Sequence, residues 1–73
     1  MLSTLENLVI LARERKKSPV DGSYTNKLLS DKSLSKAKVL EELNELIEAV
    51  ENNSNKIHEA ADIFYHLIIY LEA

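Results

Sequence analysis

Two pairs of acidic residues have the spacing and the chemistry to bind a metal ion. Glu42 and Glu45 form one pair, and Glu59 and Asp62 form the other. On a helix, side chains three residues apart lie on the same face, with Cβ atoms about 5–6 Å apart. If two such helices pack antiparallel, four carboxylates meet and repel one another unless a cation neutralises them. A cluster of oxygen ligands is typical of a site for Mg²⁺ or Mn²⁺.

The two pairs differ in their surroundings. Acidic pairs with this spacing are common on solvated helix faces. Taken alone, Glu42 and Glu45 also fit the interpretation of a solvated pair that binds no metal. Glu59 and Asp62 lie in a segment that is apolar almost throughout, where they form a narrow polar stripe with His66. His66 could pair with a carboxylate, contact a phosphate, act as a base or be a hydrogen-bonded structural residue. His58 lies off this stripe and is expected at the surface.

Four helical segments are predicted to position these residues, at about 4–16, 23–29, 33 or 35 to 51, and 56 to near the C-terminus. Ser3 and Glu6 match a capping box for the first helix. The break at 18–22 contains Pro19, which disfavours helical geometry in the residue before it, and Gly22, which permits a turn. The turn at 52–55 is rich in asparagine, which favours helix N-caps.

The third and fourth segments are predicted to pack by their apolar faces. In the third, one stripe at helical spacing is expected to be buried, and it comprises Val39, Leu43, Leu46 and Val50. The fourth is apolar nearly all round, and such a helix is normally buried. A chain of 73 residues has little interior in which to bury it. The prediction is therefore an all-α single domain over residues 1–73, a helical bundle completed by a homodimer or higher homo-oligomer.

Composition excludes several other classes of protein. The chain has no cysteine, so disulfides and zinc–thiolate sites are excluded. Its net charge of −3 argues against a general nucleic-acid binder. The N-terminal apolar run is too short for a signal peptide, and no segment has the roughly 20 apolar residues that span a bilayer. A cytoplasmic protein is expected, without membrane partners. No P-loop sequence is present.

Three segments together resemble phosphoribosyl-ATP pyrophosphohydrolase, the family of the second step of histidine biosynthesis. They are SYT at 23–25, KVLEELNE at 38–45 and EAADIFYHL at 59–67. This family belongs to the all-α nucleotide pyrophosphohydrolases, the MazG-like superfamily, whose members share an ExxE pair followed by an ExxD pair. The resemblance covers roughly residues 23–71. The acidic pairs indicate the superfamily, and the SYT and YHL segments indicate the histidine-pathway branch.

The resemblance implies a fold, a reaction and a set of site residues. The fold is that of the MazG-like pyrophosphohydrolases. The reaction is hydrolysis of the α–β phosphoanhydride of phosphoribosyl-ATP, which gives phosphoribosyl-AMP and pyrophosphate. The implied Mg²⁺ ligands, with Mn²⁺ as a possible replacement, are Glu42, Glu45, Glu59 and Asp62. One of these carboxylates, Glu42 or Glu45, could instead orient or deprotonate the attacking water.

Two basic residues complete the predicted site. Lys38 is the best candidate for a phosphate contact, because it lies about one turn before Glu42, and His66 is the second predicted substrate contact. The chain departs from the family pattern at Leu40, where the family often has glycine, and it ends at Ala73, where many members continue with a further helix. Two alternatives stay open: a house-cleaning NTP pyrophosphohydrolase with the same metal site, and a non-enzymatic helical dimerisation module.

Overall fold

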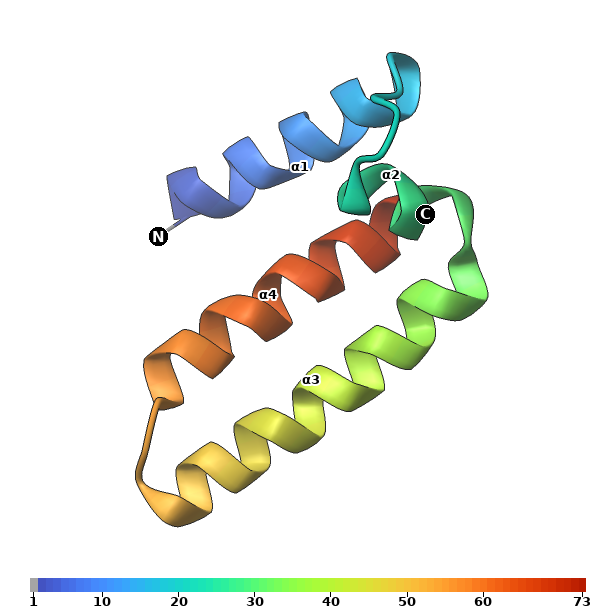
Figure 1. The fold of residues 1–73 in the computed structure, drawn as a ribbon. Coiled ribbons are helices and arrows are strands. Elements are labelled where there is room, and N and C mark those ends of the chain that lie inside the picture. The colour runs from blue at the N-terminus through green and yellow to red at the C-terminus, as the bar shows by residue number, and fades with distance from the viewer. Residues whose placement is uncertain (1) are drawn as a thin grey trace.

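A computed structural model describes residues 2–73 as four helices, and no strand occurs within that range (Figure 1). The helices are α1 (Leu2–Lys17), α2 (Tyr24–Ser30), α3 (Lys32–Asn52) and α4 (Lys56–Glu72). The predicted all-α fold is therefore confirmed. α3 and α4 form an antiparallel hairpin, α1 lies along the other side of α4, and the short α2 packs against the end of the hairpin (Figure 1).

The helix ends follow from local side-chain chemistry at most positions. Ser23 caps α2 by accepting a hydrogen bond from the backbone N–H of Asn26. Asp31 ends α2 and caps α3 through the N–H of Leu34. Before α2, Gly22 has a φ of 77°, which confirms the predicted turn. The capping role predicted for Ser3 is wrong, because α1 begins at Leu2 and Ser3 lies inside its first turn.

The turn between α3 and α4 uses its asparagines differently from the prediction. Asn55 is the N-cap residue of α4, as predicted, but its side chain makes no capping hydrogen bond. Asn53 and Asn55 both have a φ of 52°, in the left-handed region. Asparagine enters that region more readily than most residues because its short polar side chain can bond locally. These asparagines therefore serve the tight turn through their backbone conformation.

The best-packed part of the core lies where α1, α2 and α4 meet. Ala12, Leu28 and Ile69 are fully buried there, and Leu29 is 8% exposed. Two polar contacts at this end fasten α1 to the end of α4, both of them to Glu72. The Arg13 guanidinium lies 2.6 Å from its carboxylate, and the Lys16 ammonium donates to its carbonyl oxygen over 2.7 Å.

α3 is rotated relative to the prediction. Val39 and Leu46 are half-buried as expected, but Leu43 and Val50 are 42% and 56% exposed, so the predicted stripe is partly wrong. The inner face towards α4 instead contains the buried Ser35 and Ala49, with Glu42 half-buried between them in sequence. Small side chains at a helix contact allow close approach. Four exposed apolar residues form the outer stripe of α3, and they are Leu40, Leu43, Ile47 and Val50.

α4 is only partly covered by the other helices. Ile63, His66 and Ile69 are buried, whereas Ile57 and Leu71 are 85% and 75% exposed. This agrees with the expectation that one chain has too little interior to bury the helix, and the oligomer that would cover it stays a prediction. None of the helices in residues 2–73 combines the length and apolar character needed to cross a membrane.

Candidate metal and active site

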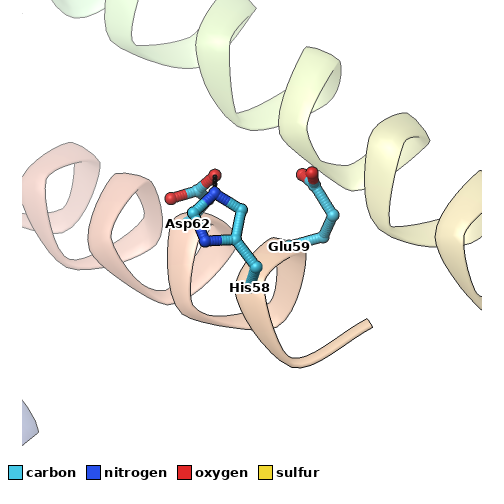
Figure 2. Close-up of side chains that lie close together, drawn as sticks. All are labelled: His58, Glu59 and Asp62. Atoms are coloured by element: carbon cyan, nitrogen blue, oxygen red, sulfur yellow. Dashed lines mark ion pairs between the residues drawn. The ribbon is translucent and has the colours of Figure 1, made fainter. Parts of the chain in front are cut away.

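Three of the four predicted carboxylates converge between α3 and α4. Glu42, Glu45 and Glu59 each offer an oxygen, and these oxygens lie within 4.8 Å of one another. Glu59 extends from α4 towards α3 (Figure 2). A hollow of about 240 Å³ opens beside Glu45 and Glu59, and the α3–α4 turn forms part of its wall. The site is therefore open to solvent and to a ligand from that side.

Two of these carboxylates have buried oxygens that bond to nothing in the described part of the chain. They are Oε2 of Glu42 and Oε2 of Glu59. Burial raises the pKa of Glu42, and the charge of the neighbouring Glu45 raises it further. An unpaired buried carboxylate is costly, and a cation removes that cost. The donor set, all carboxylate oxygen, fits a hard divalent ion such as Mg²⁺.

Asp62 lies at the edge of this cluster and faces a different neighbour. Its carboxylate is 3.5 Å from Nε2 of His58, one turn back on α4 (Figure 2). His58, Glu59 and Asp62 form a second group of potential ligands within 4.8 Å. Asp62 still contributes to the raised pKa of Glu42, so it lies within electrostatic range of the first group. Glu59 belongs to both groups, whereas His58 was expected only as a surface residue.

His66 lies beneath Tyr24 and is only 7% exposed. Its Nδ1 is 2.9 Å from the carbonyl oxygen of Asp62, and its Nε2 is 3.1 Å from the hydroxyl of Tyr24. Because a carbonyl can only accept, Nδ1 carries the proton, and in the neutral ring Nε2 then accepts from the tyrosine. The predicted substrate contact of His66 stays a prediction, since Tyr24, 46% exposed, is the member of the pair that faces solvent.

A second hydrogen bond joins the same two segments. The hydroxyl of Thr25 bonds to that of Tyr65, next to the Tyr24–His66 contact. The SYT and YHL segments are about 40 residues apart in sequence, and the fold brings them into direct contact. Sequence reasoning missed this pairing. The signal that could have indicated this contact is the occurrence of the SYT and YHL segments in the same chain.

Lys38 lies on α3 at the edge of the carboxylate cluster. Its ammonium donates to Oε2 of Glu41 over 3.2 Å, and this hydrogen bond raises the pKa of Lys38. Burial raises the pKa of the Tyr24 phenol, while the charge of Lys38 lowers it. Lys38 is therefore paired with Glu41 and lies within electrostatic range of Tyr24 and Glu42.

Comparison with known proteins now identifies the family. The family model for phosphoribosyl-ATP pyrophosphohydrolase matches residues 5–73. The chain belongs to this family. It is 43% identical to the phosphoribosyl-ATP pyrophosphatase of Listeria welshimeri, over 92% of this chain and 67% of that relative. The corresponding protein of Leuconostoc mesenteroides is 42% identical over 93% of this chain and 61% of its own length.

The family also includes longer proteins. A histidine biosynthesis bifunctional protein of Pyrococcus furiosus is 39% identical over 96% of this chain, which spans 34% of that protein. The chain therefore spans about a third to two-thirds of the length of these relatives. No solved structure gives a significant match. The phosphoribosyl-ATP pyrophosphohydrolase match includes both acidic pairs and the SYT and YHL segments.

Proposed function

We propose that this protein hydrolyses phosphoribosyl-ATP to phosphoribosyl-AMP and pyrophosphate. The observation that carries the proposal is the pair of buried, unpartnered carboxylate oxygens, on Glu42 and Glu59, that converge from α3 and α4. A protein without a cationic ligand has no reason to keep two such groups together, because each is costly when unpaired. Membership of the pyrophosphohydrolase family supports the substrate.

The proposed ligands are Glu42, Glu45 and Glu59, with Asp62 at the edge of the cluster. They would hold Mg²⁺, which Mn²⁺ can replace because it also prefers carboxylate oxygens. When bound, the metal neutralises phosphate charge and lowers the pKa of a coordinated water. The chain itself supplies the geometry: α3 presents Glu42 and Glu45 from one side, and α4 presents Glu59 from the other.

Two further roles belong to side chains near the cluster. Glu42 or Glu45 accepts the proton of the attacking water or orients that water, because a carboxylate at hydrogen-bond distance of its substrate is a competent general base. Lys38 contacts the phosphate chain, and its ammonium would leave Glu41 or bridge both groups. An ion pair this exposed contributes little to stability, so this exchange is easy.

A homodimer is the proposed assembly, in the cytoplasm. The outer stripe of α3 is apolar at the positions i, i+3, i+7 and i+10, which is the spacing of a helix packed against another helix. α4 adds exposed Ile57 and Leu71, with Phe64 and Leu67 partly exposed. Exposed apolar stripes of this kind on a small chain mark interaction surfaces. A second copy offers the same apolar surface and forms a closed two-fold pair.

The decisive test offers the protein phosphoribosyl-ATP and a panel of NTPs with Mg²⁺ and measures pyrophosphate release. We expect release from phosphoribosyl-ATP alone. Release only from NTPs would replace the proposal with a house-cleaning pyrophosphohydrolase. No release from any nucleotide, together with no metal binding, would indicate the non-enzymatic module.

A second test measures metal binding through stability. A ligand that binds only the folded state raises its stability with concentration. We expect Mg²⁺ or Mn²⁺ to raise the melting temperature, and Glu42→Gln or Asp62→Asn to weaken the effect. Glu51→Gln, which changes an exposed glutamate outside both ligand groups, is the matched control. An unchanged melting curve at saturating metal and nucleotide would count against the site.

A further inference from the structure

A cleft of about 630 Å³ lies between α2 and the loop that precedes it. Apolar side chains such as Val20 and Leu29 form part of its wall, and Tyr24, Lys16 and Lys27 contribute polar groups. This size falls within the range of pockets that bind small molecules, about 300–1,000 Å³. The carboxylate cluster does not line it, and neither predicted substrate contact, Lys38 or His66, does so.

The charge of the cleft favours an anion. Its ionised groups are two lysines and Asp21, which leave one net positive charge. Lys16 donates to the neutral carbonyl oxygen of Glu72. Lys27 is exposed, and within residues 2–73 no acidic group lies at ion-pair distance from it. Its ammonium is therefore available to a phosphate.

Tyr24 connects this cleft to the carboxylate site. It lines the cleft and bonds through its hydroxyl to His66, whose Nδ1 faces the carbonyl oxygen of Asp62. Because the hydroxyl proton is directed to His66, the oxygen of Tyr24 keeps its capacity to accept a second hydrogen bond. Glu42 lies close enough to Tyr24 to influence its phenol. The ring is thus the boundary between the two regions.

We propose that this cleft binds the phosphorylated ribose of phosphoribosyl-ATP, with Lys27 contacting its phosphate and Tyr24 accepting from a ribose hydroxyl. The inference rests on the proposed function. The substrate has a triphosphate at one end and a second phosphate, on the phosphoribosyl group, at the other. The carboxylate site takes the triphosphate, so the second anionic end needs a separate basic site. An ordinary NTP lacks that end, so the cleft would favour phosphoribosyl-ATP over NTPs.

The test measures binding of phosphoribosyl-AMP and of AMP by calorimetry, with EDTA present so that metal plays no part. We expect phosphoribosyl-AMP to bind about tenfold or more tighter than AMP, the size of effect that one charge-assisted hydrogen bond supports. Lys27→Ala should reduce this advantage about tenfold. Tyr24→Phe should weaken binding of phosphoribosyl-AMP about threefold to tenfold, since it keeps the ring and removes the hydroxyl that accepts from the ribose and donates to His66.

The matched control is Lys56→Ala, which removes an exposed lysine at the start of α4, away from the cleft. It should leave the binding of both nucleotides unchanged, and the melting temperature of each variant verifies folding. The inference is overturned if wild-type protein binds AMP as tightly as phosphoribosyl-AMP or binds neither, or if Lys27→Ala binds like wild type. The proposed function fails by a separate readout, the absence of pyrophosphate release from phosphoribosyl-ATP with Mg²⁺.

Discussion

Two faces of α3 depart from the usual polarity of a surface helix, because the inner one includes a charged residue beside the half-buried Val39 and Leu46 and the outer one exposes an apolar stripe. The inner face, against α4, carries Ser35, Glu42 and Ala49, and it contains a buried carboxylate oxygen without a partner in residues 2–73. The outer stripe consists of four large apolar residues that are 42–56% exposed. An ordinary surface helix buries its apolar face and exposes its charges. The proposed metal site would use the charged residue of the inner face, and the proposed dimer would cover the outer stripe.

Stability must then come from another part of the molecule. The α1–α2–α4 junction, with Leu28 and Ile69 fully buried, is the candidate. Ile69→Ala should lower the free energy of unfolding by about 2–5 kcal/mol, because it leaves a cavity. Ile10→Ala, at a 54% exposed position on α1, should change it by less than about 0.5 kcal/mol. Urea denaturation measures the free energy of unfolding of both variants. An equal loss of this free energy in the two variants would contradict the prediction.

The inner face should matter for catalysis more than for folding. Glu59→Gln should reduce pyrophosphate release from phosphoribosyl-ATP about a hundredfold or more, since even changes next to metal ligands cost about 10–100-fold. The melting temperature without metal should not fall, because an unpaired buried charge is removed. Steady-state kinetics with Mg²⁺ measure the effect. If Glu59→Gln is as active as the control variant Glu51→Gln, Glu59 is not a metal ligand.

The outer stripe should matter for assembly. Ile47→Lys should raise the dimer dissociation constant about tenfold or more, because it would bury an unpaired ammonium in an apolar contact. Asn44→Lys, also exposed on α3 but outside the stripe, should leave the dimer unchanged. Sedimentation equilibrium at micromolar concentration compares the two. A wild-type monomer in this experiment would refute the dimer.

The smallest expected effect is on stability in the absence of metal. Burial raises the pKa of Glu42 above its ordinary value of 4.5, so the folded protein binds this proton more tightly than the unfolded chain. Stability from this group is therefore present below about pH 4.5 and is lost as pH rises through the folded pKa. At pH 7 with EDTA, Glu42→Gln should be more stable than wild type by about 1 kcal/mol.

Melting curves between pH 4 and pH 8 test this sign. The advantage of Glu42→Gln should shrink as pH falls, because wild-type Glu42 then becomes protonated and neutral as well. Saturating Mg²⁺ should reverse the order, since only the wild-type carboxylate gains from the metal. If Glu42→Gln is less stable than wild type at pH 7 without metal, the ionised Glu42 carboxylate does not destabilise the folded protein, and the prediction is wrong.

Features that depend on residues close in sequence were predicted correctly, whereas contacts between residues far apart in sequence were missed. The four helices and the convergence of Glu42, Glu45 and Glu59 follow from periodicity and spacing within one hairpin. The exposure of Leu43 and Val50 could not be predicted, because periodicity identifies an apolar stripe but not the element that covers it. The Tyr24–His66 bond joins residues 42 apart, and no local rule relates them.

The left-handed asparagines of the α3–α4 turn also have a consequence for folding kinetics. Asn53 and Asn55 close the hairpin within a few residues, and Glu45 and Glu59 lie on either side of it. Contacts between residues close in sequence need little loop-closure entropy and form early. The three converging carboxylates can therefore assemble as soon as this hairpin forms, before α1 and α2 dock. A divalent ion present during refolding should then accelerate the folding rate as well as raise the final stability.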